Sequence, residues 1–315
     1  MTWGAPIWFD LWLAGMAGGA YFTGFLVDRL SGGANKRLFR LATYLGIPLA
    51  VIGVILLIVD LGVPIRFWRL LTEFKLITAM SMGTWILMAW VIIAFILVAL
   101  WWAERFVSEK TSRNLQRLTS LLAGINVVFA VLLMTYTGAL LAVSSQPLWA
   151  GTVILPSLFV ASAISTGVAI LIITALIATA ITKGNWTELK LAINQVTGST
   201  DWAISNQTVR QLAKTLAVVI VIELVVLIGY VIWLGTSGMV GTGEALNLLF
   251  TGVLAAPFWI GVVLLALLIP FGLLVTNWGK EIESKVVWRA IVTSSACVIV
   301  GGLILRAVIA IGGQI

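Results

Sequence analysis

Eight long apolar stretches, separated by polar segments, constrain the fold of this chain more than any other feature. Each stretch exceeds the roughly 20 residues that an α-helix needs to cross the hydrocarbon core of a bilayer. Backbone polar groups in lipid must be paired within the segment, so helices are expected. The sequence therefore predicts an all-α integral membrane protein. Its eight transmembrane helices should lie at about 7–30, 41–63, 82–106, 119–145, 156–182, 213–235, 253–275 and 290–311.

The composition supports the membrane class. Of the 315 residues, 61% are hydrophobic and only 10% are charged, and the mean hydropathy is +1.12. A soluble domain would carry about a quarter charged residues. No basic leader with a cleavable small-residue site opens the first stretch, so we expect it to be retained as the first helix.

Lysine and arginine gather in alternate connections between the stretches, and this predicts the topology. Cytoplasmic loops collect Lys and Arg, so we expect these connections in the cytoplasm and both termini outside the cell membrane. The net charge of +7 therefore indicates topology and contact with anionic lipid rather than nucleic-acid binding. The connections concerned are the first, third, fifth and seventh, with Arg29, Lys36, Arg37, Arg40, Arg105, Lys110, Arg113, Arg117, Lys183, Lys190, Arg210, Lys214, Lys280, Lys285 and Arg289.

The second connection is an exception, because it lies on the outer side and yet carries Arg66, Arg69 and Lys75. It follows Asp60, which stands at the end of the second apolar stretch. Asp60 could pair with Arg66 or Arg69 and fix the turn as a structural ion pair. Alternatively, this basic and aromatic outer loop docks a partner protein, and the sequence leaves both interpretations open.

Two absences narrow the chemistry. The chain has no His, which excludes bis-His haem ligation, His-ligated metal and His proton relays. It has one Cys, Cys297, and a single thiol cannot hold an iron–sulfur cluster or form an internal disulfide. We therefore expect no haem and no tightly ligated metal in this chain.

Asp10 is the first candidate site residue, because ionisable groups inside membrane spans are costly and mark functional sites. Its neighbours are aromatic, in the run Trp8-Phe9-Asp10-Leu11-Trp12. One interpretation is a carboxylate near the helix N-terminus, favoured by the helix dipole and reached by water. The other is a carboxyl group held against aromatic surface, which suits it to proton exchange.

Two further features lie in the first and fourth stretches. Gly15, Gly18 and Gly19 leave room for another helix or for a flat ligand, and helix packing alone would explain them. Tyr136 lies in the outer half of the fourth stretch, where its hydroxyl needs a partner. That partner could be a backbone carbonyl or the carbonyl group of a ligand.

Glu223 and Arg306 lie inside the sixth and eighth stretches. An unpaired charge at either depth would cost several kcal/mol, so both must face the bundle interior or water. They could form a structural pair, although the sequence places them at different depths. The alternative is a proton path through Glu223.

The order of these residues resembles the NrfD/polysulfide reductase membrane-subunit family over essentially the whole chain. No single motif is very specific, but the ordered set in an eight-helix chain is. It comprises Asp10, the Gly15–Gly19 cluster, Asp60-Leu-Gly62-x-Pro64-x-Arg66-Phe67, Ser81-x-Gly83, Tyr136-Thr-Gly138, Pro147-x-Trp149, Leu155-Pro156-x-Leu-Phe159, Ser162, Gly167, Leu305-Arg306 and Gly312-Gly313.

The resemblance implies two four-helix bundles, residues 1–150 with a quinone site and residues 151–315. It implies a membrane subunit that exchanges electrons with menaquinone or ubiquinone and binds no haem. Its partners would be a ferredoxin-like iron–sulfur subunit and a molybdopterin catalytic subunit, docked on the outer face. The terminal substrate would be chosen by a different chain.

The resemblance also suggests site residues, with one departure. The polysulfide reductase pattern has a His before the glycine cluster where this chain has Asp10. Asp10 and Tyr136 would contact the quinone and take part in its chemistry, with Gly15 and Gly18 completing the site. The resemblance and the topology further suggest a proton path through Asp60, Glu223 and Arg306, and partner docking at Arg66, Arg69 and Lys75.

Two other classes of function stay open. A proton-coupled or solute transporter would use Glu223 and Arg306 along its path and should contain a broken helix near the bilayer midplane. Pro257 and Pro270 in the seventh stretch are the only hint of such a break. A passive membrane anchor without a quinone site would tolerate changes at Asp10 and Tyr136.

Overall fold

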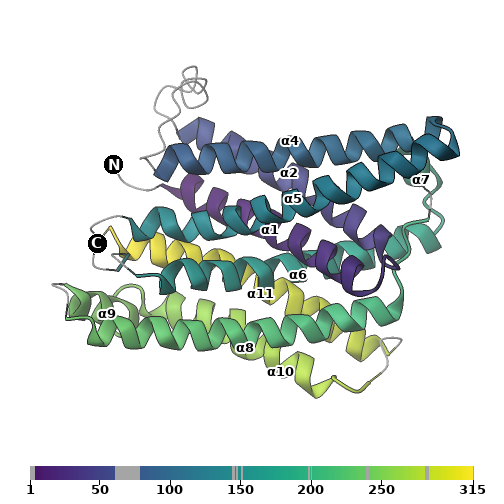
Figure 1. The fold of residues 1–315 in the computed structure, drawn as a ribbon. Coiled ribbons are helices and arrows are strands. Elements are labelled where there is room, and N and C mark those ends of the chain that lie inside the picture. Colours follow the sequence, from purple (N-terminus) through teal and green to yellow (C-terminus); the bar gives the residue numbers. More distant parts are fainter. Residues whose placement is uncertain are drawn as a thin grey trace.

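The structure is all-helical in the part of the chain that it describes, and it is a computed structural model. The longest helices are α1 (Ala5–Leu30), α2 (Lys36–Asp60), α4 (Ala79–Ala103), α5 (Glu109–Ala142), α6 (Ile154–Lys183), α8 (Asn206–Thr236) and α11 (Lys285–Gly312). They run roughly side by side (Figure 1). The described residues are 4–60, 79–143, 146, 148–149, 152–197, 199, 201–238, 241–280 and 284–314.

Seven helical segments within these ranges are long and apolar enough to cross a membrane. They are α2, α4, α5, α6, α8, the run Pro257–Thr276 and α11. The first helix, α1, has 26 residues and is long enough, but it contains Asp10, Asp28 and Arg29 and is not among these seven. Eight crossings therefore remain a prediction, because the apolar criterion alone does not include α1.

Some predicted helix boundaries are wrong. The fourth helix, α5, begins at Glu109 rather than near residue 119, and α8 begins at Asn206 rather than near residue 213. In both cases the polar residues of the connection continue the helix beyond the apolar core. Hydropathy locates the apolar part of a helix that crosses the membrane. It does not locate the residue at which the helical backbone hydrogen bonds end. At the start of α8 the cap is explicit, because the Ser205 hydroxyl accepts from the Thr208 backbone N–H at 3.1 Å.

Three short helices complete the described chain. The expected loop between 183 and 212 contains α7 (Thr187–Thr197), and α9 (Thr242–Phe250) precedes the seventh span. A short 3₁₀ turn, η2, covers Glu104–Phe106. The helices α7 and α9 were not predicted, because an amphipathic helix of a few turns has too few apolar residues to stand out by hydropathy. The η2 turn lies at the end of the helix predicted for 82–106.

The seventh span is wound unusually. Its first part, η3 (Pro257–Leu268), is a π-helix, and it continues directly into α10 (Ile269–Thr276). At the junction the Ile269 N–H donates to the Leu264 carbonyl, next to Pro270, which has no N–H to donate. The transporter interpretation predicted a broken helix here, whereas the chain stays helical from Pro257 to Thr276.

The buried side chains form two hydrophobic clusters. One is built from α1, α2, α4 and α5, and the other mainly from α6, α8, η3, α10 and α11. Helix α1 joins them, because it packs extensively on both α2 and α6. The backbones of α1 and α6 touch, since a Cβ at Gly19 would overlap the Ala163 carbonyl. A division near residue 150 is compatible with the two clusters and stays a prediction.

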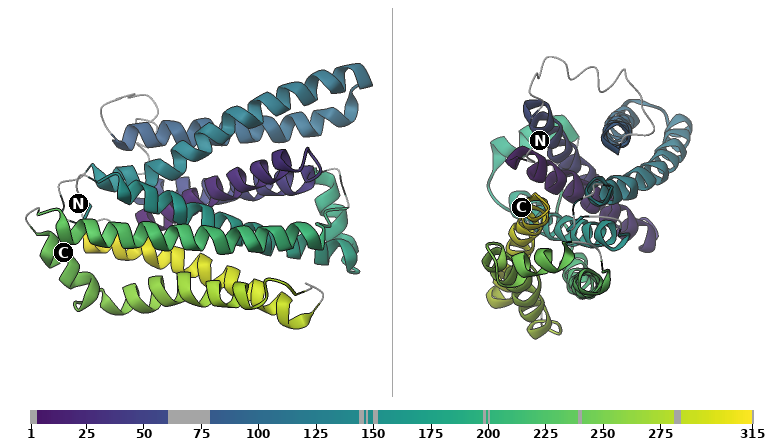
Figure 2. Two further views of the ribbon diagram at one scale, coloured as in Figure 1. Left: turned by 60° about the horizontal axis from the view of Figure 1, so that its bottom comes forward. Right: turned by 90° about the vertical axis from the view of Figure 1, so that its left-hand side faces the viewer.

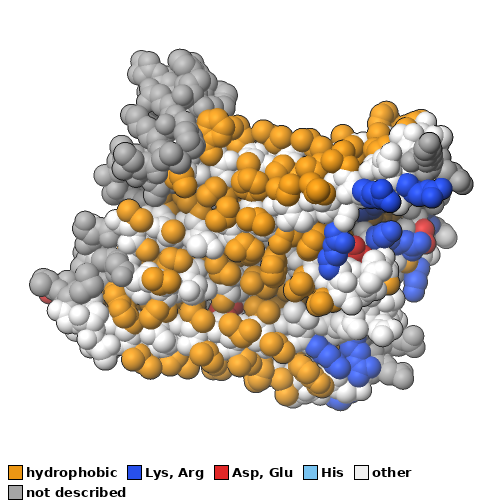
Figure 3. Space-filling model, viewed as in Figure 1, with side chains coloured by type: hydrophobic (Ala, Val, Ile, Leu, Met, Phe, Trp, Pro, Cys, Tyr) orange, Lys and Arg blue, Asp and Glu red, His pale blue; other side chains and the backbone are white. Residues whose placement is uncertain are grey.

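The two ends of the helix assembly differ in charge. The start of α1 and the end of α11 lie together at one end (Figure 1), and Lys and Arg gather at the opposite end (Figure 3). On the face shown in Figure 3, hydrophobic side chains cover most of the surface between the ends. At the basic end, α7 lies crosswise to the long helices (Figure 2).

Candidate functional site

Asp10 lies inside the helix assembly rather than at its edge. It is the sixth residue of α1, and only 5% of its surface is exposed. Its side chain points at α2, because a Cβ built on Gly53 would lie 2.5 Å from Asp10 Oδ1. Within the described residues, Oδ1 has no hydrogen-bond partner. A buried acceptor without a partner is costly, so this geometry favours the interpretation of a desolvated carboxyl group over that of one reached by water.

Aromatic residues enclose the same turn of α1. Trp8 stacks on Phe9 with ring centroids 4.7 Å apart, and Phe9 meets Trp12 edge-on at 6.3 Å. The Trp12 indole N–H donates to the Ile299 carbonyl of α11 at 3.1 Å. This bond fixes the start of α1 against the last helix and holds the turn that carries Asp10 in place.

Tyr136 reaches the same region from α5. Its ring lies directly over Gly83 of α4, where any Cβ would overlap it. It is close enough to Asp10 for electrostatic interaction. Whether its hydroxyl bonds to a backbone carbonyl or to a ligand stays a prediction. The structure thus brings Asp10 and Tyr136 together among α1, α2, α4 and α5, and one carboxylate oxygen of Asp10 has no hydrogen-bond partner among the described residues.

The glycines of α1 face other helices. A Cβ at Gly15 would lie 2.8 Å from Arg306 Nη2, and one at Gly18 would lie 3.1 Å from the Ala130 carbonyl oxygen of α5. These contacts are of the kind that small residues permit between close helices. Contact of Gly15 and Gly18 with a quinone stays a prediction, and their described neighbours are protein.

A second polar site lies among α1, α6, α8 and α11. The Glu223 side chain of α8 is buried, and the Ser165 hydroxyl of α6 donates to its Oε2 at 2.6 Å. Arg306 of α11 is fully buried. Its Nη1 donates to the Ser162 hydroxyl at 3.2 Å and to the Gly302 carbonyl at 2.9 Å.

Two serines on one face of α6 therefore connect Glu223 and Arg306, which the sequence placed at different depths. Ser162 and Ser165 lie one turn apart, and Ser162 is also close to the Glu223 carboxylate. The side-chain charges of Glu223 and Arg306 attract each other, although no nitrogen–oxygen distance between the two groups is below 4 Å. The serines thus supply hydrogen bonds to both buried charges. Such bonds help to offset the cost of removing the two charges from water.

Arg306 also contacts α1. Its Nε donates to the Leu11 carbonyl at 3.2 Å, and its guanidinium lies 5.5 Å from the ring centroid of Phe159. Its Nη2 faces Gly15 and has no hydrogen-bond partner in the described ranges. Arg306 therefore connects the helix that carries Asp10 to the network that holds Glu223.

Several predicted residues cannot be placed. Arg66, Arg69 and Lys75 lie outside the described residues. Asp60 ends α2, but its side chain is not described. Docking at these residues, and a contribution of Asp60 to a proton path, stay predictions.

The sequence analysis gave no site role to four residues that shape the two sites, although Gly83 and Ser162 are among those that carry the family resemblance. Gly53 and Gly83 make room for Asp10 and Tyr136, and Ser162 and Ser165 bridge Arg306 and Glu223. Two serines at i and i+3 in an apolar helix are a weak signal of an interhelical polar face. The glycines give no such signal, because their role depends on the register between helices.

Comparison with known proteins identifies relatives of the chain. Protein NrfD of Escherichia coli (strain K12) is 29% identical over 192 residues, which cover 55% of this chain and 59% of that protein. The C chain of polysulfide reductase from Wolinella succinogenes is 31% identical over 179 residues, covering 53% of this chain and 56% of that protein. A protein NrfD homolog of Haemophilus influenzae is 27% identical over 335 aligned positions, covering 100% of this chain and 95% of that protein.

The first two matches span little more than half the length of those relatives. The family model described as "Polysulphide reductase, NrfD" instead matches residues 1–315. Together with the seven apolar helices, this match confirms a multi-pass membrane protein. The resemblance inferred from the order of Asp10, Tyr136 and Arg306 is likewise confirmed: the chain belongs to the polysulphide reductase NrfD family.

Proposed function

We propose that this chain is the membrane subunit of a respiratory oxidoreductase complex. It would exchange electrons between membrane quinone or quinol and an iron–sulfur partner subunit. The name of one relative, the C chain of polysulfide reductase, denotes one chain of a multi-chain reductase. The observation that carries the proposal is the buried Asp10 carboxyl group beside Tyr136, with an oxygen that no described residue bonds.

The residues at this site suit a quinone headgroup. A quinone carbonyl accepts a hydrogen bond and a quinol hydroxyl donates one, and the bound quinone supplies the electron-transfer chemistry. The Tyr136 hydroxyl can donate to a carbonyl, and the ionised Asp10 carboxylate can accept from a hydroxyl. Asp10 also serves as the proton acceptor, since its oxygen has no other described partner.

The proposal includes an orientation. The end that gathers Lys and Arg is cytoplasmic, and both termini, with the Asp10 site, are at the outer face. An iron–sulfur subunit of ferredoxin type docks there through Arg66, Arg69 and Lys75, and a molybdopterin catalytic subunit completes the complex. Electrons would then travel a short distance between quinone and partner, without a metal in this chain.

A second proposal concerns proton movement. Glu223, the serines of α6 and Arg306 form a continuous polar connection through the apolar interior. Hydroxyl groups that both donate and accept can pass a proton between a carboxyl group and its neighbours. We propose that this network, with Asp60, carries protons during quinone turnover. The anchor and transporter interpretations stay open as alternatives.

The function is tested by replacing Asp10 with Asn in the assembled complex. The amide keeps the size of the side chain but cannot accept a proton. Loss of a positioned base typically lowers rates by about 10²–10⁴-fold, so quinol turnover should fall at least tenfold. Asp28→Asn is the matched control, since Asp28 is a carboxyl group at the far end of the same helix.

Assembly should be intact in both variants, as judged by the co-purifying polypeptides and iron content. Unchanged turnover in Asp10→Asn and in Tyr136→Phe would favour a passive anchor. An assembly that contains neither iron nor quinone, although intact, would favour a transporter, with Glu223 the next residue to replace.

A further inference from the structure

A cavity of about 240 Å³ lies at the basic end of the molecule, between α2, α6 and α7. It is separate from both polar sites described above. Its lining is almost entirely apolar, and one ammonium group borders it. The lining residues that matter here are Leu41, Ile177, Ala178, Ile181, Ile193 and Lys190.

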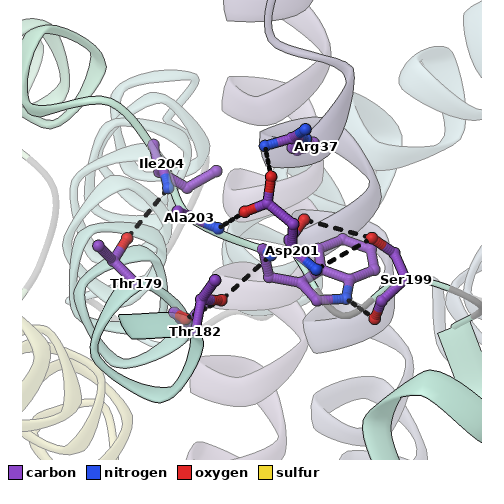
Figure 4. A network of polar contacts seen from close by, with 9 residues as sticks. Arg37, Thr179, Thr182, Ser199, Asp201, Ala203 and Ile204 are labelled. Carbon is purple, nitrogen blue, oxygen red and sulfur yellow. Dashed lines mark hydrogen bonds and ion pairs between the residues drawn. The ribbon is translucent and has the colours of Figure 1, made fainter. Parts of the chain in front are cut away.

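The wall of this cavity is fixed by hydrogen bonds. Trp202 closes one side, and its backbone N–H donates to the Thr182 hydroxyl at 3.1 Å. The Trp202 indole N–H donates to the Ser199 carbonyl at 2.9 Å, and the Ile204 N–H donates to the Thr179 hydroxyl at 3.0 Å. Figure 4 shows how these bonds attach the segment before α8 to α6. These hydrogen bonds therefore hold the wall of the cavity in a defined position.

The cation that lines the cavity, Lys190, has no counterion among the described residues. Arg37 pairs with Asp201 at 2.7 Å, and Arg40 pairs with Glu104 at 3.4 Å. Lys190 forms no ion pair with any described carboxylate. It is half-buried and borders the apolar cavity. The cavity thus presents a positive charge that a ligand could neutralise.

The surroundings are those of a membrane–water interface. Helix α7 lies crosswise to the long helices (Figure 2), and Trp186 just before it and Leu189 within it are exposed. Such an amphipathic helix lies in the interface plane, with its apolar side chains at the acyl boundary. Ile177, on the transmembrane helix α6, is 53% exposed at the mouth of the cavity. The cavity therefore opens where a lipid acyl chain meets its headgroup.

We propose that this cavity binds a phospholipid with an acidic headgroup from the leaflet at the basic end. An acyl chain would fill the apolar part between Ile177, Ile181 and Ile193, and the headgroup phosphate would lie at Lys190. A zwitterionic headgroup also carries a phosphate, but its own cationic group offsets that charge, whereas an acidic headgroup keeps a net negative charge beside Lys190. The acidic lipid thus matches both the apolar lining and the charge of the cavity.

The proposal is tested by native mass spectrometry of the full chain in mild detergent. Phosphatidylglycerol and phosphatidylcholine with identical acyl chains are titrated in parallel. We expect phosphatidylglycerol to bind more tightly, and Lys190→Ala to weaken it roughly fivefold, because one basic residue near an anionic lipid contributes about that factor. Lys183→Ala is the matched control, a cation at the same end that does not line the cavity.

A second variant tests the apolar part. Ile177→Trp should obstruct the mouth and weaken phosphatidylglycerol without a core clash, because Ile177 is half exposed. Equal binding of the two lipids by the unaltered chain would overturn the proposal. So would equal losses in Lys190→Ala and Lys183→Ala, or displacement of the lipid by a short-tailed quinone. Asp10→Asn should bind lipid normally, which separates this test from that of the quinone site.

Discussion

Asp10 and Glu223 are both carboxylic acids buried inside apolar helices, yet their environments differ. Glu223 accepts a hydrogen bond from Ser165 and is attracted by Arg306, so its polar capacity is used within the protein. Asp10 has an oxygen without a hydrogen-bond partner among the described residues and shares its site with Tyr136. The difference indicates that the Glu223 carboxylate is paired within the chain, whereas the Asp10 carboxyl group is open to an external ligand.

The largest effect is expected at Arg306. Removing one partner of a buried charge pair typically costs about 3–5 kcal/mol, because the other charge is left uncompensated. Arg306→Met should therefore lower the thermal stability of the detergent-solubilised chain strongly or prevent its accumulation. The double variant Arg306→Met/Glu223→Gln removes both charges and should recover part of the loss. If the double variant were less stable than Arg306→Met, the two groups would not be coupled.

Amide substitutions compare the two carboxyl groups directly. Glu223→Gln leaves the buried Arg306 without its charge partner and, like Arg306→Met, should cost about 3–5 kcal/mol. Asp10→Asn removes no described hydrogen bond and should leave stability unchanged while reducing turnover. The measurement is the unfolding midpoint of each variant in the same detergent. Equal destabilisation by both substitutions would mean that Asp10 has a structural partner after all.

A smaller effect is expected at Gly83, where the ring of Tyr136 occupies the space of a Cβ. Gly83→Ala should displace Tyr136 and cost about 1–3 kcal/mol, as overpacking usually does. Quinol turnover should fall together with stability. Gly124→Ala on α5 is the control, because nothing lies within 4 Å of the added Cβ. Equal behaviour of the two variants would contradict the packing of Tyr136 on α4.

The smallest effect is expected at Ser165. Ser165→Ala removes one hydrogen bond to Glu223 and should cost about 1 kcal/mol. Ser157→Ala, whose exposed hydroxyl bonds to the Val153 carbonyl one turn earlier, should cost less. If protons pass through the network, Ser165→Ala should also lower proton release relative to quinol oxidation. A pH-electrode measurement on reconstituted vesicles gives this ratio, and an unchanged ratio would count against the proton path.

The sequence was sufficient for the fold class and for the charges that matter. Long apolar runs predict helices, and Asp10, Glu223 and Arg306 stand out because ionisable groups are rare in such runs. The alternation of Lys and Arg predicts the basic end seen in Figure 3. These inferences need only local composition, so they do not depend on how the helices pack.

The remaining features depend on the register between helices. Gly53 lies against Asp10, and Gly15 lies against Arg306, although each pair is distant in the sequence. The Ser162–Ser165 connection places Glu223 and Arg306 in one network, whereas the sequence suggested different depths. Helix α7 was missed because it is short and polar, so its sequence does not form a long apolar run.

The most direct test of the central claim is to map where quinone binds. The assembled complex is illuminated with a photoreactive quinone, and the labelled peptides are identified by mass spectrometry. Labelling should concentrate on the turns of α1 and α5 that carry Asp10 and Tyr136, and excess unmodified quinone should suppress it. Labelling confined to α6, α8 or α11, or unaffected by competing quinone, would contradict a quinone site at Asp10 and Tyr136.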